Sequence, residues 1–147
     1  MNSMFSYCTG LTSLDISKFD TSNVKDMGSM FSNCRGLTSL DLSCLNTSNV
    51  TDMMSMFMHC EGLTVLNLGD LDTRNVNNMA QMFLYCSGLT SLNLQNFDMS
   101  NVTSYNSMFS SVPKSVVITT NQAAKDWLEE KGFSAWLGNV TIVEKTI

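Results

Sequence analysis

Hydrophobic positions recur along the chain at a fixed interval. The dipeptide Met-Phe stands at 4–5, 30–31, 56–57, 82–83 and 108–109, always with the same step and without an insertion. Three further columns keep this step: Cys8, Cys34, Cys60 and Cys86; Gly10, Gly36, Gly62 and Gly88; Asn23, Asn49, Asn75 and Asn101. Such agreement indicates a repeat architecture in which each unit packs on its neighbours, because a single unit is too small to bury its own hydrophobic face.

Each repeat contains a short stretch in which apolar and polar residues alternate. Leu40 and Leu42 alternate with Ser39, Asp41 and Ser43, and this period of two predicts a strand that turns its leucines inward. Strands from successive repeats would lie about 4.8 Å apart in a parallel sheet. The rule for parallel crossover connections makes the coil right-handed.

The second half of each repeat has the spacing of a short helix. In one repeat the apolar positions are Val50, Met53, Met56, Phe57 and Cys60. Their steps of 3, 3, 1 and 3 predict one buried helix face. Asn49 stands at the expected N-cap, with Asp52 three residues later. Gly62 suits the left-handed conformation that ends a helix, so each repeat is predicted to be strand, turn, helix and turn.

The chain departs from the repeat after about residue 112, and residues 113–147 are predicted to form a capping unit on the array of residues 1–112. The cap contains a strand at Val116–Thr120, a helix over about Gln122–Lys131 and a strand near Val140–Val143. Ile118 takes the place of Leu14, Asn121 caps the helix and Gly132 ends it. Both tryptophans lie in this unit, which we expect to cover the last repeat.

Composition narrows the classes of function. The chain is 44% hydrophobic and 14% charged, which excludes intrinsic disorder. Eight scattered Lys and Arg residues and a net charge of −5 offer no basic patch for nucleic acid. The single histidine, His59, makes a histidine-centred metal site or a Ser-His triad hard to build. No apolar run approaches the roughly 18 residues of a membrane span. We therefore expect no catalytic residue, no metal and no cofactor.

The repeat L-x-x-L-x-L-x-x-F-x-T-S-N-V-x-x-M-x-x-M-F-x-x-C resembles that of the BspA-like bacterial surface leucine-rich-repeat proteins, also found in mycoplasma lipoproteins. The resemblance covers about residues 3–112. It implies a leucine-rich-repeat solenoid, and with the pattern above the predicted α/β fold has one short parallel strand and one short helix per repeat. It also implies display on a cell surface or secretion, and adhesion to an extracellular or host protein or to a glycan. The family has no shared catalytic residues.

Cysteine and methionine columns lie on the predicted apolar face. We expect Cys8, Cys34, Cys60 and Cys86 to be buried free thiols, with Cys8 the least protected. A disulfide within the column, or a zinc or redox site, is the alternative. Cys44 is out of register and is expected to be exposed and oxidisable. Two methionine columns are expected to fill the core: Met30, Met56 and Met82, and Met27, Met53 and Met79. A methionine-rich binding surface is the alternative.

Polar columns have structural and functional interpretations. Asp20, Asn46, Asp72 and Asp98 share one position before the helix, where Asx turns are expected and a calcium site is the alternative. The asparagine column is expected to be structural. His59 is expected to be a solvated surface residue. Asn46, Asn49, Asn101 and Asn139 begin formal glycosylation sequons, which follow from the repeat and are weak signals.

The outward face of the sheet is the candidate ligand surface, because the sheet faces of curved repeat arrays are commonly used for binding. It is predicted to carry Ser13, Asp15, Ser17, Ser39, Asp41, Ser43, Val65, Asn67, Gly69, Ser91, Asn93 and Gln95. It has no aromatic anchor, so binding is expected to be weak. The first hypothesis for function is a protein-binding or adhesive surface module, and the alternative is a spacer without a ligand of its own.

The N-terminal end begins within a repeat, and no signal-peptide pattern is visible there. We expect a fragment of a longer surface protein or the exposed end of an array. Met4, Phe5, Leu11, Leu14 and Ile16 would then present part of a core face to solvent, beside the open edge of a strand near Ser13–Ile16. A weak homodimer through this open end is the expected consequence.

Overall fold

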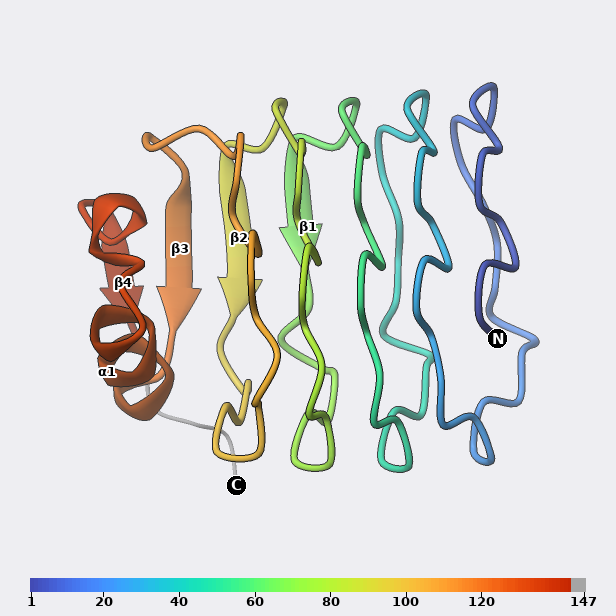
Figure 1. The fold of residues 1–147 in the computed structure, drawn as a ribbon. Helices are drawn as coiled ribbons and strands as arrows, with labels where there is room; N and C mark the ends of the chain where they lie inside the picture. Colours follow the sequence, from blue (N-terminus) through green and yellow to red (C-terminus); the bar gives the residue numbers. More distant parts are fainter. Residues whose placement is uncertain (144–147) are drawn as a thin grey trace.

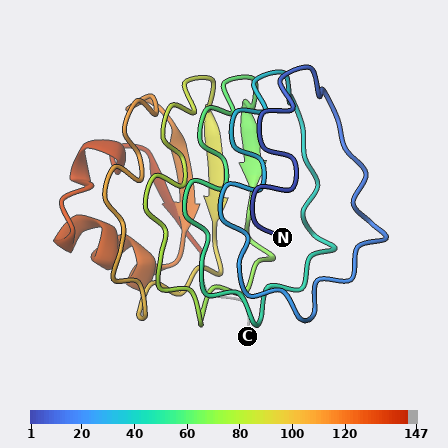
Figure 2. The ribbon, with the colours of Figure 1, turned by 45° about the vertical axis from the view of Figure 1, so that its right-hand side comes forward.

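The chain has a mixed α/β fold in a computed structural model that describes residues 1–143. One parallel sheet contains β1 (Val65–Asn67), β2 (Ser91–Leu94), β3 (Val117–Thr120) and β4 (Val140–Ile142), in that order. The helix α1 spans Gln122–Glu130, and a single 3-10 turn covers Ser134–Trp136. Figures 1 and 2 show the chain as a row of flattened coils, with the N-terminus at one end and α1 at the other.

Strand register follows the repeat length. Leu66 pairs with Leu92, and Leu92 pairs with Ile118, so each partner is the equivalent residue of the next coil. This confirms that Ile118 takes the place of the repeat leucine. The step changes at the C-terminal end, where Ile118 pairs with Val140.

The two N-terminal coils precede β1 in the row and form no strand, so the strands predicted at residues 39–43 and near residues 13–16 are wrong (Figure 1). Between these two coils the bond from the N–H of Thr38 to the carbonyl of Thr12 is long, at 3.3 Å. The corresponding bond from Thr90 to Thr64 is 2.8 Å, and there the ladder of β1 and β2 begins. Polar and apolar positions nevertheless alternate as predicted, since Leu42 is buried between exposed neighbours.

The helix predicted in the second half of each repeat is also wrong. Backbone N–H groups at alternate positions donate to the next coil instead of to their own. In one coil the donors are Met27, Ser29, Phe31 and Asn33, and the acceptors are the carbonyls of Asp52, Met54, Met56 and Met58, at 2.7–3.0 Å. Turns closed by bonds such as Met30 to Met27 lie between them. We call this stretch the turn segment of each coil.

Left-handed residues rule out a helix in the turn segment. Ser29 and Asn33 have φ of 54° and 61°, and the equivalent residues of the other coils repeat these values. Such angles interrupt right-handed helix at two places in each coil. The distance between successive coils explains why no helix forms here. Phenylalanine rings in successive coils are 5.4–6.1 Å apart, whereas a helix with its side chains is about 10 Å wide.

The asparagine column connects coils and does not cap helices. The side-chain amide of Asn49 donates to the carbonyl of Ser22 at 2.7 Å, and Asn75 donates in the same way to Ser48. Asn101 repeats the bond to Arg74 at 2.6 Å. These three asparagines therefore have a structural role, but the groups they satisfy are carbonyls of the preceding coil and not N–H groups at helix starts.

The glycine column is required by close approach between coils, and the predicted left-handed conformation of Gly62 is wrong. Among the described glycines only Gly132 has a positive φ, of 86°. A Cβ atom at Gly62 would lie 2.7 Å from the carbonyl oxygen of Arg35, and one at Gly88 would lie 2.3 Å from that of Glu61. Gly10, in the first coil, has nothing within 4 Å of such an atom.

The core runs the length of the array between the sheet and the turn segments. Three successive coils contribute the same apolar set, all with no exposed surface: Met27, Met30, Phe31 and Cys34; Met53, Met56, Phe57 and Cys60; Met79, Met82, Phe83 and Cys86. The assignment of the two methionine columns, Met27, Met53 and Met79 and Met30, Met56 and Met82, to the core is therefore confirmed. Stacked rings join Phe5, Phe31, Phe57, Phe83 and Phe109 into one ladder.

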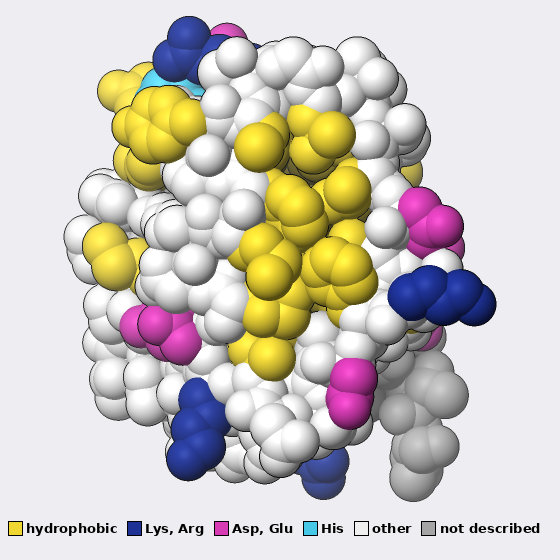
Figure 3. All heavy atoms as spheres, turned by 90° about the vertical axis from the view of Figure 1, so that its right-hand side faces the viewer, with side chains coloured by type: hydrophobic (Ala, Val, Ile, Leu, Met, Phe, Trp, Pro, Cys, Tyr) yellow, Lys and Arg dark blue, Asp and Glu magenta, His cyan; other side chains and the backbone are white. Residues whose placement is uncertain are grey.

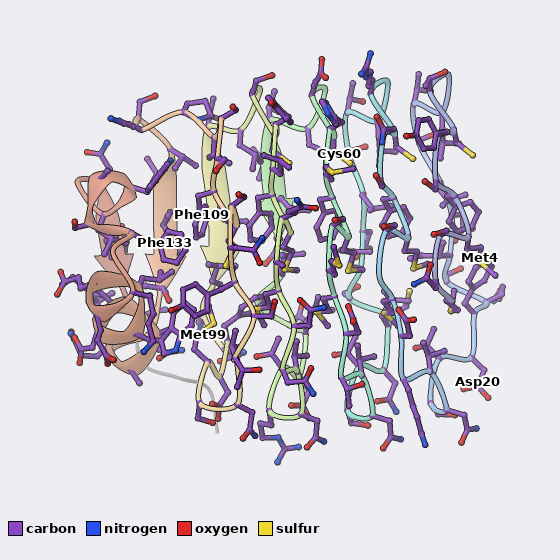
Figure 4. The ribbon with its side chains drawn as sticks, in the orientation of Figure 1. Met4, Asp20, Cys60, Met99, Phe109 and Phe133 are labelled. Carbon is purple, nitrogen blue, oxygen red and sulfur yellow. The ribbon has the colours of Figure 1, made fainter. Side chains whose placement is uncertain are left out.

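The C-terminal segment packs over the last coil as predicted. Asn121 caps α1 by accepting from the N–H of Ala124 at 2.9 Å, and Gly132 follows the helix with its positive φ. The ring centroids of Phe133 and Phe109 are 5.3 Å apart (Figure 4). The indole N–H of Trp136 donates to the carbonyl of Val112. Residues 144–147 of the predicted cap lie outside the described residues, and the division at residue 112 stays a prediction.

Substituting alanine at a glycine of the column should destabilise the chain. For Gly62→Ala we expect a loss of about 1–3 kcal/mol, because the new methyl group would press on backbone atoms of the preceding coil. Gly10→Ala is the matched control and should cost nothing, since the space beside it is open. Urea unfolding of the three proteins measures both values. Equal losses in the two variants would contradict the close-approach explanation.

Methionine truncation tests the core in the same way. Met56 has no exposed surface, and Met56→Ala should cost about 2–5 kcal/mol of unfolding free energy. Met54 is 42% exposed, so Met54→Ala should be nearly neutral. Thermal and urea unfolding provide the measurement. A loss below about 1 kcal/mol for Met56→Ala would contradict the assignment of the column to the core.

Candidate binding surfaces

The predicted sheet face points outward. Its residues in the first three coils, from Ser13 to Asn67, are exposed, and Ser91, Asn93 and Gln95 are half-buried. Gly69 is the exception, since it is buried. Val65 is 58% and Val117 is 41% exposed, and both pair with Ser91. This face therefore carries small and mostly polar side chains, with Val65 and Val117 as exposed apolar residues on the two sides of Ser91.

Side chains on this face are largely engaged with one another. Asp15 and Asp41 each accept the N–H of the serine two residues on, at 2.9 and 3.0 Å. These bonds from Ser17 and Ser43 hold the pKa of both carboxyl groups below the usual range. The amide of Asn93 donates to Asn67, which itself accepts from the N–H of Gly69. The polar groups here shape the turns that follow the sheet.

The acidic column forms the predicted Asx turns. Asp20, Asn46, Asp72 and Asp98 each accept the backbone N–H two residues on, at 2.9–3.1 Å. Asp72 also forms an ion pair with Arg74 at 2.6 Å. The described residues contain no group of three His, Cys, Asp or Glu side chains arranged to hold a metal ion. The arrangement therefore gives no support to the calcium alternative.

The cysteine column is buried as predicted, except at its open end. Cys34, Cys60 and Cys86 are buried free thiols, and each Sγ lies 3.0–3.2 Å from the carbonyl of the phenylalanine in the preceding coil. Burial raises the pKa of all three, that of Cys86 to about 12. Cys8 is exposed, so its expected burial is wrong, because the first coil has no coil packed over this position. Cys44 is exposed as expected.

A cluster of larger side chains on the turn segments was not predicted. We define the turn-edge cluster as Arg35, His59, Glu61 and Tyr85. The His59 ring stacks on Tyr85 with centroids 4.5 Å apart. Glu61 Oε1 lies 3.0 Å from His59 Nδ1 and 3.4 Å from Arg35 Nε. His59 lies at the surface as expected, but its side chain is half-buried and contacts Tyr85 and Glu61.

The sequence carried a signal for this cluster. His59 and Tyr85 occupy a column that otherwise holds Tyr7, Asn33 and Ser111, so the residue type in this column varies between repeats. Both residues have positive φ, 58° and 60°. The backbone of the turn segment thus positions these side chains next to each other in adjacent coils. Because this segment was interpreted as a helix, no contact between His59 and Tyr85 of adjacent repeats was predicted.

The N-terminal end exposes part of the core. Figure 3 shows a continuous hydrophobic patch on this end. We define it as the end face, formed by Met4, Phe5, Leu11, Leu14, Phe19 and Val24; Met4 is 52% exposed and the others are half-buried. Ile16 is only 2% exposed, so its predicted exposure is wrong. Its side chain is buried in the core and does not belong to the end face.

At the opposite end, α1 and the preceding turn enclose a small pocket of about 180 Å³. Phe97, Met99, Asn121, Ala123 and Trp127 line it, with the turn at Asp98 and Ser100. The Asn121 amide is occupied by bonds to the carbonyls of Gln95 and Phe97. This pocket therefore offers few polar groups for a ligand. Within the described residues, no helix has the length and apolar character needed to cross a membrane.

Comparison with known families gives one match. A family model described as "Mycoplasma protein of unknown function, DUF285" matches residues 1–127. Neither the curated proteins nor the solved structures include a significant match to the chain.

Thiol labelling distinguishes the exposed cysteines from the buried column. Cys8 and Cys44 should react quickly with iodoacetamide at pH 8, whereas Cys34, Cys60 and Cys86 should react slowly because burial hides them and suppresses the thiolate. Mass spectrometry of digests taken over time gives the five rates separately. In denaturant all five should react alike. Fast labelling of Cys60 in the native protein would show that the column is open.

Proposed function

We propose that this chain, which belongs to the Mycoplasma protein family of unknown function DUF285, is a non-catalytic module for protein–protein interaction or adhesion. In this proposal the stacked coils are a right-handed solenoid of leucine-rich-repeat type. Support comes from the strand register, in which Leu66, Leu92 and Ile118 pair with the same step as the sequence repeat. A rigid row of coils presents fixed side chains over a long surface, as binding by repeat proteins requires.

The turn-edge cluster is the observation on which the proposal rests. Tyrosine and arginine are enriched among residues that dominate binding energy at interfaces. Tyr85 is 45% exposed, whereas the phenylalanines of the ladder are buried from Phe31 onward. The Arg35 side chain is 54% exposed and is held near Glu61. An aromatic face, a carboxylate and a guanidinium thus share one rigid surface that the core does not use.

The sheet face is a second candidate surface, favoured by the exposed pair Val65 and Val117. It lacks aromatic anchors, and its asparagines are bonded to each other. We therefore rank it below the turn-edge cluster. The competing function is a spacer without a ligand, in which both surfaces are only solvated.

Location at a cell surface, or secretion, is also part of the proposal. It rests on the resemblance of the repeat to the BspA-like surface proteins. The partner would then be an extracellular or host protein, or a glycan on it. A planar aromatic group beside a carboxylate suits either, because aromatic rings pack on apolar side chains and on the apolar faces of sugars.

Binding to immobilised fibronectin, laminin, collagen and a glycan array tests this proposal. We expect wild type to bind at least one probe, and Tyr85→Ala to weaken that binding by about 30-fold, as for a hot spot of about 2 kcal/mol. Tyr7→Ala is the matched control, since Tyr7 shares the column but is not stacked on His59. Val65→Ser tests the sheet face.

The pattern of losses separates the alternatives. Loss on Val65→Ser with Tyr85→Ala unaffected would transfer the site to the sheet face. Equal loss on Tyr7→Ala and Tyr85→Ala would remove the case for the cluster. Absence of binding by wild type to every probe would favour the spacer.

A further inference from the structure

One column of the turn segments determines which side chains lie along the turn edge of the array. We call it the edge column, and it holds Asn33, His59, Tyr85 and Ser111 in successive coils. All four residues have a positive φ, between 58° and 64°. The N–H groups of the first three donate to carbonyls of the next coil at 2.7–2.9 Å. The edge column therefore places its side chains at equivalent positions, one coil apart.

The ring stack in this column covers one face of Tyr85. The His59 and Tyr85 rings are within 13° of parallel, with centroids 4.5 Å apart. Hydrogen-bonded neighbours lie roughly 4.8 Å apart, so rings at adjacent positions of the column stack directly. The next position holds Ser111, whose side chain is too small to cover a ring. Tyr85 is accordingly 45% exposed, and within residues 1–143 its ring contact is with His59.

Residues that flank this open face in the same two coils are small or apolar. Leu84 precedes Tyr85 and is half-buried, and Ser87 follows it and is exposed. In the next coil Ser111 is exposed, and Pro113, the equivalent of Ser87, is half-buried. The open face of Tyr85 therefore lies beside carbon-rich side chains and two small hydroxyl groups.

The charged groups of these coils are paired or disfavour a cation. Glu61 lies in the coil of His59, and its Oε1 is 3.0 Å from His59 Nδ1 and 3.4 Å from Arg35 Nε. This carboxylate therefore already has two partners. Lys114, in the coil of Ser111, is exposed, and its positive charge disfavours a cationic occupant such as a guanidinium. A neutral flat ring suits this environment.

We propose that the open face of Tyr85, above Ser111, receives an aromatic side chain of the partner protein, which extends the stack begun by His59. Parallel, offset rings attract each other beyond the area that they bury. A sugar would need hydrogen-bonding groups directed beside its ring, and the nearest carboxylate is already engaged. The inference rests on the proposed function, because it specifies what the turn-edge cluster recognises.

Nuclear magnetic resonance of the full chain with N-acetyltryptophanamide tests this site without a macromolecular partner. The indole should shift the ring resonances of Tyr85 upfield, because each stacked ring shields the other. The Kd should be in the millimolar range, as for contact with a single ring. Tyr105, half-buried against Trp127 and Phe133, is the internal reference. N-acetylleucinamide and methyl galactoside should not displace the indole.

Ser111→Tyr tests the position of the occupant. The new ring should cover Tyr85, so the variant alone should already show upfield-shifted Tyr85 resonances. The further shift caused by the indole should fall by about tenfold or more. The variant should fold, since tyrosine at a positive φ is present at Tyr7 and Tyr85. Ser107→Tyr is the matched control, because Ser107 is an exposed left-handed residue of the same coil outside the edge column.

The same variants apply to any protein that the binding screen identifies. Ser111→Tyr should weaken that binding by about 30-fold, as Tyr85→Ala does, because the chain's own ring takes the place of the partner's. Ser107→Tyr should leave the binding unchanged.

Three results with the small probes would overturn the inference: no shift of Tyr85 by the indole, an equal shift in Ser111→Tyr, or displacement of the indole by N-acetylleucinamide. Displacement by methyl galactoside would overturn it in favour of a sugar. A protein partner that binds wild type and Ser111→Tyr equally would overturn it and leave the proposed function intact. A chain that binds the indole above Ser111 but none of the macromolecular probes would support the aromatic site and count against the proposed function.

Discussion

Two rows of backbone hydrogen bonds between coils set the constraint from which the rest of the structure follows. One row joins the strands, and the other joins the turn segments, where Ser29 donates to Met54 and Phe31 donates to Met56. Both rows must stay in register at once. A coil that gained or lost one residue would shift one row against the other and turn inward side chains outward. This requirement explains why the Met-Phe dipeptides recur at a uniform step along the sequence.

The same constraint explains why the apolar spacing of Val50, Met53, Met56 and Phe57 does not produce a helix. Coils joined by backbone hydrogen bonds on both sides lie roughly 5 Å apart, as strands do. Helices about 10 Å wide cannot stack at that distance. Left-handed residues such as Ser55 and His59 instead fold the segment into turns that keep the same side chains inward. Within residues 1–143 the α-helix α1 lies in the C-terminal cap, where the step between paired strands differs from that of the repeat.

Prediction from the sequence succeeded where the repeat alone decides the outcome and where local chemistry is unambiguous. The column step placed Ile118 beside Leu92, and the pattern around Asn121 and Gly132 identified the helix of the cap. It failed where the hydrogen-bond partner lies in another coil. The Asn49 amide could bond within its own segment or to the preceding coil, and the apolar period does not distinguish these two partners. Strand spacing could have excluded the repeated helix, since it limits the room for every segment of a coil.

Many polar side chains of the repeat already form structural hydrogen bonds, and this limits where a ligand can bind. Asparagine side chains such as Asn49 and Asn75 satisfy carbonyls of the preceding coil, and Asp20 and Asp41 close turns. A residue engaged in this way cannot bind a partner without giving up a bond that joins two coils or closes a turn. Side chains without such a structural role occur at positions where the residue type changes from one repeat to the next. The change from Asn33 to His59 and Tyr85 adds large side chains to a fixed backbone position. Specific recognition in such an array therefore depends on departures from the repeat, and its stability depends on the repeat itself.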